Sequence, residues 1–363
     1  MLLDHLDGHR IVAITGLTKN TGKTTTFNHL VRQAGERGGR VAGPRLGITS
    51  IGRNGERWDA ITRERKPLIW APEGIWLATA EVALEKSRVH LQHASTVMGS
   101  PFGSILLGQV TVPGSVELVG PQTGAGVLTV TRSLRAAGAE LVLVDGTFGR
   151  RFTAAAELSD GVIIATGATA GNTFQTVIER TRSLAAFFRL PAPPEPLRGR
   201  AARALRAGHV ALLTAGGGSV ALPWRTALGQ GAAIAETLRT GNHQGVSLLP
   251  VEALVLPGAL TNGVANELAA GDAGPLAIVV PDAACLLLDA PHARRLGDRG
   301  ISLAPLHVTP LLAVTVNPYR HGRQSLPAGE LRDALAGALA PVPVINVADE
   351  GAVLATAQLD VPV

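Results

Sequence analysis

The chain has 363 residues, of which 46% are hydrophobic and only 3% aromatic, and its formal net charge is +5. This apolar content excludes a disordered chain, and at about 150 residues per domain the length predicts about two domains. The single cysteine, Cys285, excludes a disulfide framework and any multi-cysteine zinc site. The basic residues are dispersed and few aromatic side chains are present to stack on bases, so nucleic acid is not an expected partner.

The apolar runs of the sequence are short. None approaches the ~20 residues that a membrane-spanning helix needs, so we expect no membrane segment. Residues 1–10 are too polar and too few for a secretory signal. We therefore expect a cytoplasmic globular protein.

Short apolar runs alternate with helical patterns in the first half of the chain. Strands are expected at 10–15, 40–42, 104–112, 115–119, 140–144 and 161–166, and helices at 23–36, 123–137 and 173–188. The runs of Val, Ile and Leu lack polar alternation, which favours a parallel sheet covered on both faces. Residues 1–190 are therefore predicted to form an α/β domain with a mostly parallel sheet.

A composition break follows, with prolines at 191, 193, 194 and 196. The segment 191–206 is the predicted linker, and 207–363 is predicted to be a second α/β domain of unknown ligand. Strands are expected there at 209–214, 253–257, 276–281, 312–316 and 342–347, and helices at 224–239, 262–270, 283–296 and 327–339. The run Asn317-Pro318-Tyr319 ends one of these strands and could face a ligand between the domains.

A loop rich in glycine and threonine joins the first strand to the first helix. It reads Gly16-Leu17-Thr18-Lys19-Asn20-Thr21-Gly22-Lys23-Thr24-Thr25-Thr26. Small residues let backbone N–H groups converge on phosphate oxygens, and the helix N-terminus adds a partial positive charge. The loop is one residue longer than the general G-x-x-x-x-G-K-S/T spacing, because Leu17 stands where the first glycine would be. This context predicts a phosphate-loop NTPase domain; a plain turn that caps the helix is the alternative.

The polar residues of this loop have distinct expected roles. Lys23 would reach the β- and γ-phosphates of ATP, and the Thr24 hydroxyl would ligate Mg²⁺. Lys19 stands shortly before Lys23, as in one branch of phosphate-loop proteins where such a lysine contacts phosphate across a dimer interface. It would neutralise charge on the γ-phosphate, and a homodimer is expected. The other candidates for nucleotide binding are Gly16, Thr18, Asn20, Thr21, Gly22 and Thr25.

The lysine content supports this interpretation. Of the 33 basic residues only Lys19, Lys23, Lys66 and Lys86 are lysines, and the rest are arginines. Arginine suits planar bidentate contacts, whereas a phosphate cradle calls for a flexible point charge. Two lysines in one short loop of an arginine-rich chain therefore favour phosphate chemistry over a turn.

A second acidic feature lies at the end of the apolar strand 140–144. Asp145 is placed as the aspartate that orients Mg²⁺ in phosphate-loop proteins, usually through water, and Gly146 would let the backbone approach the γ-phosphate. An ordinary Asp-Gly turn is the alternative. No Glu follows Asp145, so the group that positions water is expected elsewhere. Asp59 is the candidate, in a polar stretch after the first helix that also contains Thr49 and Ser50.

Residues 14–26 resemble the nucleotide loop of the ATP-binding component of the lysine 5,6-aminomutase reactivases, the KamB type. Further matching runs are 47–53, Asp59, Lys66-Pro67, Gly120-Pro121, 144–146, 166–168 and, in the second half, Val316-Asn317-Pro318-Tyr319. The resemblance implies an ATPase that releases damaged cobalamin from an adenosylcobalamin-dependent aminomutase. It also implies that the aminomutase and a second reactivase subunit are partners.

Two other function classes fit the same residues. A ligase or kinase for a small molecule is one, because dethiobiotin-synthetase-like enzymes share the strand, the loop and an acidic residue before glycine, and residues 144–149 are distantly similar. A nucleotide-dependent binding module without turnover is the other, favoured by the missing carboxylate after Asp145. ATP turnover separates these classes. Stimulation by a protein indicates the reactivase, stimulation by a small acid or amine indicates the ligase or kinase, and ATP binding with negligible turnover indicates the binding module.

Overall fold

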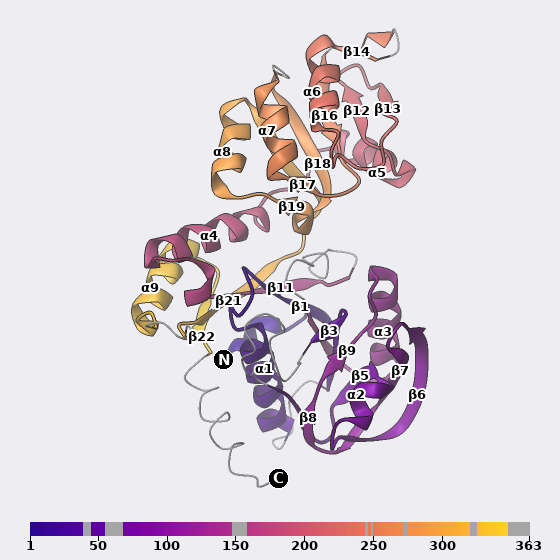
Figure 1. Ribbon diagram of the computed structural model, residues 1–363, viewed down its shortest axis with the longest axis vertical. Coiled ribbons are helices and arrows are strands. Elements are labelled where there is room, and N and C mark those ends of the chain that lie inside the picture. Colours follow the sequence, from indigo (N-terminus) through magenta and orange to yellow (C-terminus); the bar gives the residue numbers. More distant parts are fainter. Residues whose placement is uncertain are drawn as a thin grey trace. The chain divides into compact units, whose positions relative to one another are not determined.

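The computed structural model describes residues 1–38, 45–54, 68–146, 158–243, 246–247, 250–271, 274–319 and 325–347. Over these residues the chain is α/β, with a large, mostly parallel sheet and several helices (Figure 1). The chain divides into two compact units, Met1–Arg182 with Pro310–Val363, and Ser183–Thr309. The expected α/β class is confirmed.

The first unit contains a nine-stranded sheet in the order β22-β21-β11-β1-β10-β2-β5-β7-β6. Neighbouring strands from β22 to β5 are parallel, and β7 and β6 extend the sheet in antiparallel pairing. The strands are β1 (Ile11–Gly16), β2 (Leu46–Ser50), β5 (Trp76–Ala80), β6 (His90–Ser100), β7 (Gly103–Val112), β10 (Leu141–Asp145), β11 (Gly161–Gly167), β21 (Leu311–Asn317) and β22 (Val344–Asn346).

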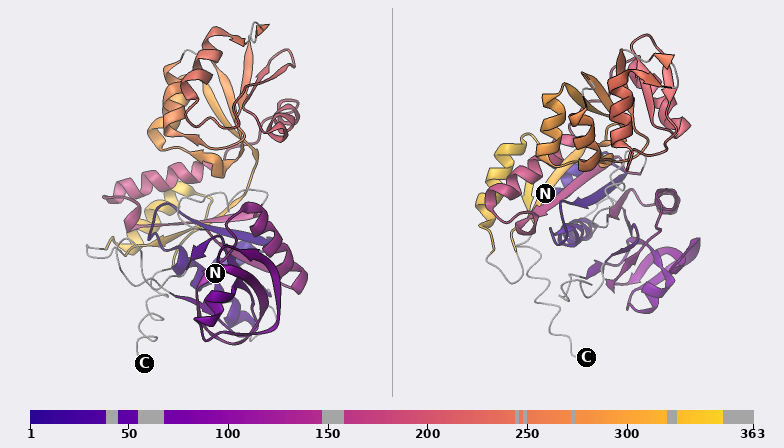
Figure 2. Two further views of the ribbon diagram at one scale, coloured as in Figure 1. Left: turned by 45° about the vertical axis from the view of Figure 1, so that its right-hand side comes forward. Right: turned by 45° about the horizontal axis from the view of Figure 1, so that its top comes forward.

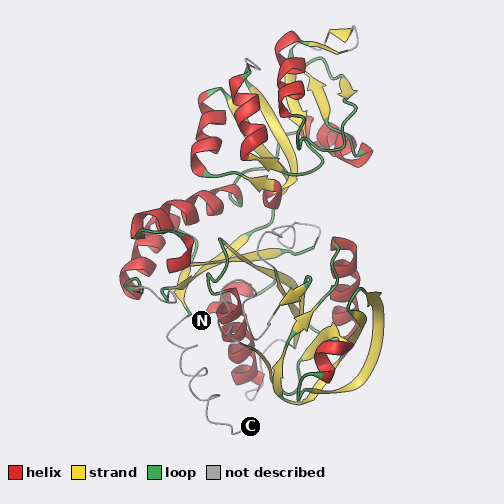
Figure 3. Ribbon diagram, viewed as in Figure 1, coloured by secondary structure: helices red, strands yellow, loops and turns green. Residues whose placement is uncertain are grey.

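Helices cover both faces of this sheet (Figure 3). The core on one face includes η1 (Leu2–Leu6) and α1 (Lys23–Gly38), and the core on the other includes α3 (Gly124–Ala137). In β10, Leu143 belongs to the first core and Val142 to the second, so alternate residues are buried on opposite sides. This double burial explains the uninterrupted apolar strands of the sequence.

Further helices and short strand pairs complete the first unit. They are α2 (Glu81–Glu85), α4 (Phe174–Phe187), α9 (Ala328–Leu339), η3 (Ala168–Ala170) and the strand pairs β3 (Arg53–Asn54) with β9 (Leu118–Val119) and β4 (Ile69–Ala71) with β8 (Gly114–Val116). Helix α4 continues past Arg182 into the second unit.

The second unit has a five-stranded sheet in the order β13-β12-β16-β18-β20, in which the last three strands are parallel. Helix α5 (Leu197–Ala207) lies on one side of this sheet, and α6 (Gly231–Thr240), α7 (Asn262–Ala270) and α8 (Ala290–Asp298) lie on the other (Figure 2). The strands are β12 (Ala211–Thr214), β13 (Ser219–Ala221), β16 (Val251–Val255), β18 (Leu276–Asp282) and β20 (Ile301–His307). The short elements are β14 (Asn242–His243), β15 (Val246–Ser247), β17 (Leu260–Thr261), η4 (Ala283–Cys285) and β19 (Leu286–Leu287).

The organisation of the chain differs from the expected domains 1–190 and 207–363 joined by a linker. Within 191–206 the structure has most of α5, whose residues Leu197, Ala201 and Ala204 pack into a core with β12 and β16. The strands expected at 312–316 and 342–347 do form, but they are β21 and β22 of the first sheet. The second unit is therefore inserted into the first, an arrangement that local composition does not reveal.

The polar stretch after α1 also differs from expectation, because it contains buried strands of the first sheet. Thr49 and Ser50 lie in β2 and are fully buried. The Thr49 hydroxyl donates to the Ala78 carbonyl at 3.0 Å, and the Ser50 hydroxyl donates to the Leu118 carbonyl at 3.0 Å. Such internal hydrogen bonds allow polar residues in a buried strand. The strand expected at 40–42 lies outside the described residues.

Candidate functional site

The loop between β1 and α1 lies at the carboxyl end of the parallel strands. β1 is an interior strand of the sheet, between β10 and β11. Gly16 pairs with Ala165 of β11, and the Leu17 N–H donates to the Ala165 carbonyl at 3.1 Å, so the ladder continues into the loop. The carboxyl edge of an open α/β sheet is where such folds bind ligands.

Gly16 leaves space that the rest of the loop fills. A Cβ built on Gly16 would lie 2.7 Å from Thr21 Oγ1 and 2.8 Å from Lys23 Nζ. The Lys23 side chain therefore folds back over the loop, so that its ammonium group lies beside the end of β1. A side chain at position 16 would occupy this place, and that explains the glycine.

Internal hydrogen bonds hold the loop in shape. The Thr21 hydroxyl donates to the Thr18 carbonyl at 3.0 Å, and the Thr18 hydroxyl lies 3.2 Å from the Thr169 carbonyl in η3. Asn20 and Gly22 have φ values of 59° and 92°, in the left-handed region. The Thr26 N–H donates to the Gly22 carbonyl at 2.8 Å and closes the first turn of α1.

The predicted loop residues differ in exposure. Thr21 is buried, whereas Thr18, Gly22, Lys23, Thr24 and Thr25 are half-buried. Lys19 and Asn20 are exposed, and Lys19 forms no ion pair with any residue that the structure describes. The loop thus presents Lys19 to solvent while it holds Lys23 over its own backbone.

Asp145 lies beside the strand that leads into the loop. It ends β10, is only 2% exposed, and is opposite Ile14 of β1 and Ser50 of β2. The Gly146 N–H donates to the Ile14 carbonyl at 3.1 Å and so extends the β1–β10 ladder by one residue. Asp145 therefore ends the strand next to the one that leads into the loop, and its predicted role toward Mg²⁺ stays a prediction. Asp59, the third predicted element of the site, lies outside the described residues.

Sequence reasoning did not connect β21 with the loop. The hydroxyls of Thr26 and Thr315 are 2.6 Å apart and buried, although the residues are 289 positions apart in the chain. A Cβ built on Gly22 would lie 2.6 Å from the Asn317 Cβ, so Asn317 packs directly on the loop. The sequence does predict that the run Asn317-Pro318-Tyr319 ends a strand, but it places that strand in a second domain and not beside the loop.

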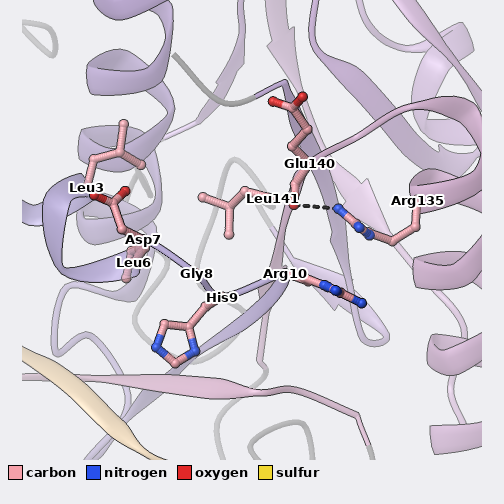
Figure 4. Close-up of a pocket in the computed structure, with 9 residues that line it drawn as sticks. All are labelled: Leu3, Leu6, Asp7, Gly8, His9, Arg10, Arg135, Glu140 and Leu141. Atoms are coloured by element: carbon pink, nitrogen blue, oxygen red, sulfur yellow. Dashed lines mark hydrogen bonds between the residues drawn. The ribbon is translucent and has the colours of Figure 1, made fainter. Parts of the chain in front are cut away.

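A cavity of about 330 Å³ lies at the opposite edge of the same sheet, near the amino ends of β1 and β10 (Figure 4). Its lining residues are Leu3, Leu6, Asp7, Gly8, His9, Arg10, Arg135, Glu140 and Leu141. Arg135 donates to the Ala139 carbonyl at 2.8 Å and also to the Glu140 carbonyl. The Arg45 N–H donates to the Glu140 carboxylate and holds the pKa of Glu140 below its usual value. These contacts hold the chain between α3 and β10 together, away from the loop.

The residues around the loop all belong to the first unit. No family model, curated protein or solved structure matches this chain. Among the described residues, no group of three or more His, Cys, Asp or Glu side chains could hold a metal ion. No helix of this part of the chain is both long and apolar enough to span a bilayer.

Proposed function

We propose that the chain binds ATP with Mg²⁺ at the loop between β1 and α1 and hydrolyses it. The observation that supports this most is the place of the Lys23 ammonium, 2.8 Å from where a Gly16 Cβ would be. A lysine folded back over its own loop holds a positive charge where the β- and γ-phosphates of a bound nucleotide would lie. The N-terminus of the 16-residue helix α1 adds its partial positive charge at the same place.

Thr24 and Asp145 are the residues that would hold Mg²⁺. Mg²⁺ usually keeps several waters and takes one or two protein oxygens together with substrate phosphates. A hydroxyl at the start of α1 and a carboxylate at the end of the adjacent strand β10 fit that donor set. The ion would neutralise charge on the β- and γ-phosphate oxygens.

The protein's own part in hydrolysis is to orient phosphate and to spread negative charge. Lys23 would contact the phosphates of its own loop, because it already lies over that loop. Lys19 is exposed and able to contact the γ-phosphate, in its own subunit or across a homodimer. Asp59 is the proposed group that positions the attacking water. Attack in line with the leaving oxygen needs little covalent help beyond this positioning.

The purpose that we propose for hydrolysis is a conformational switch. The resemblance of the loop and its neighbours to the aminomutase reactivases is the support for this. Nucleotide-dependent ordering of loops would change the affinity for an adenosylcobalamin-dependent aminomutase and so release damaged cobalamin. A second reactivase subunit belongs to the same proposal.

The test is the rate of ATP hydrolysis, measured alone, with candidate small acids and amines, and with an adenosylcobalamin-dependent aminomutase. We expect slow basal turnover that the aminomutase increases, and a loss of about 100-fold in Lys23→Ala. Lys86→Ala, at the exposed end of α2, is the matched control and should retain wild-type turnover.

Each alternative has its own outcome in this experiment. Stimulation by a small acid or amine without a protein partner would indicate a ligase or kinase. ATP binding without turnover under any condition would indicate a binding module. Equal turnover of wild type and Lys23→Ala would contradict the proposed site.

A further inference from the structure

The carboxyl end of β21 contacts the loop between β1 and α1. A Cβ on Gly22 would lie 2.6 Å from the Asn317 Cβ and 3.1 Å from its Nδ2. A Cβ on Gly167, the last residue of β11, would lie 1.9 Å from the Asn317 carbonyl oxygen. Asn317 therefore fills the space between the loop and the end of β11.

Tyr319 follows this contact by two residues. Its N–H donates to Asn317 Oδ1 at 3.2 Å, and the next carbonyl back, of Pro318, accepts the Leu326 N–H at 3.0 Å. The side chain of Asn317, packed on the loop, thus fixes the backbone that carries Tyr319. These contacts hold the backbone of Tyr319 close to the residue that packs on the loop.

The exposure of Tyr319 is unusual in this chain. It is the only tyrosine among 363 residues of which 3% are aromatic, and it is 49% exposed. Among the described residues, one other aromatic side chain is classed as exposed, that of Trp70, at 40%. A half-exposed aromatic ring gains only part of the free energy that its burial would give. Such rings are frequent at binding surfaces.

The order of the strands would orient a nucleotide bound at the loop. Asp145 ends β10 on one side of β1, while β11 and then β21 lie on the other side. If Thr24 and Asp145 held Mg²⁺ beside the terminal phosphates, the γ-phosphate would lie on the β10 side of the loop. The α-phosphate, ribose and base would then extend toward β11 and β21, and β21 leads to Tyr319.

We propose that Tyr319 is an aromatic platform on which the base of the bound nucleotide stacks. This inference rests on the proposed nucleotide binding at the loop and adds the base-binding residue. Stacking tolerates every base because each has a π-face, so Tyr319 supplies affinity without choosing between adenine and guanine.

The test uses calorimetric titration of the full-length chain with two probes, MgATP and inorganic tripolyphosphate with Mg²⁺. Tripolyphosphate carries the phosphates without a base. We expect Tyr319→Leu to weaken MgATP binding about 10-fold, to weaken MgGTP binding by the same factor and to leave tripolyphosphate binding unchanged. Tyr319→Phe keeps the ring and should bind MgATP like the wild type. Trp70→Leu, which removes the other exposed aromatic ring, should also bind like the wild type.

Three results overturn the inference. Unchanged MgATP affinity in Tyr319→Leu shows that the ring does not contact the base. An equal loss for MgATP and tripolyphosphate shows that the residue acts through the shape of the loop. Failure of both probes to bind the wild-type chain refutes the proposed function, and with it this inference. In the first two outcomes, by contrast, tripolyphosphate with Mg²⁺ still binds to the wild-type chain.

Discussion

Gly22 meets two separate steric constraints at the start of α1. Its φ of 92° lies in the left-handed region, which residues with a Cβ rarely adopt. Its Cα also faces Asn317, whose Cβ would be 2.6 Å from an added Cβ. Single residues of this kind set the loop geometry more strictly than the general spacing of glycines does.

Gly22→Ala should lower the free energy of unfolding by about 2 to 4 kcal/mol, because it adds a steric clash to an unfavourable φ. Gly74→Ala is the matched control, since Gly74 has a φ of 86° but nothing within 4 Å of an added Cβ. It should cost only about 1 to 2 kcal/mol, the backbone part alone. Urea unfolding of both variants measures the difference. Equal losses would show that Asn317 gives way without cost.

Cys285 is a second position where the surroundings decide the chemistry. Burial raises the pKa of its thiol to about 12, and the negative charge of Asp282 adds to the effect. The pKa of this thiol is higher in the folded chain than in the unfolded chain, so the unfolded chain loses the proton first as the pH rises. The free energy of unfolding is therefore unaffected below about pH 9 and falls as the pH rises from about 9 toward about 12.

The thiol of Cys285 should therefore react slowly with an aromatic disulfide reagent at about pH 8 in the folded chain and rapidly in urea. It is the only cysteine, so the absorbance of the released thiolate reports it alone. Cys285→Ala should also lose less stability than the wild type between about pH 9 and pH 11. Equally fast labelling in the presence and absence of urea would contradict the raised pKa.

At the scale of elements, a side-chain contact joins the first turn of α1 to β21. The hydroxyls of Thr26 and Thr315 are 2.6 Å apart and buried, and Thr26 Oγ1 also lies 3.0 Å from the Gly22 carbonyl. The first turn of α1 is thereby tied both to the loop and to a strand from the far end of the chain.

A double-mutant cycle tests this tie. Thr26→Val and Thr315→Val should each lower the free energy of unfolding, and the double variant should lose about 1 kcal/mol less than their sum. Thr237→Val, in α6 of the second unit, serves as the control and should be additive with either one. Chemical unfolding gives all the terms. Strict additivity of Thr26→Val and Thr315→Val would show that the hydroxyls do not interact.

The elements that the sequence predicted well are those with local signals. The helices at 23–36, 123–137, 262–270 and 327–339 have apolar periodicity, and they form as α1, α3, α7 and α9. The sequence does not predict β2, because Thr49 and Ser50 are residue types typical of loops. Their internal hydrogen bonds explain why they are buried in a strand. The meeting of Asn317 with Gly22 depends on pairing across the insertion, which no local pattern encodes.

At the scale of the whole molecule, the first unit is made of two separate chain segments. β21 and β22 follow the inserted unit in sequence but continue the sheet beyond β11. A boundary after residue 190 would remove both strands and leave the edge of β11 without its neighbour. The strand β11 is buried along its whole length, so exposing it is costly.

Residues 1–190 alone should therefore fail to fold cooperatively, whereas residues 1–190 joined by a glycine-serine linker to 310–363 should keep the sheet. Thermal unfolding followed by circular dichroism compares the two proteins, and sedimentation reports their aggregation. A cooperative transition is expected only for the joined protein. The same transition in both would show that β21 and β22 contribute nothing essential to the first unit.

Calorimetric titration with MgATP measures whether Lys23 binds nucleotide phosphate at the loop between β1 and α1. We predict saturable binding to the wild-type chain and a loss of affinity of about 100-fold, or about 3 kcal/mol, in Lys23→Ala. Lys86→Ala should bind like the wild type, and equal unfolding midpoints in urea would establish that all three proteins are folded. Undiminished MgATP affinity in folded Lys23→Ala, or no binding to the wild-type chain, would contradict the binding of nucleotide phosphate by Lys23.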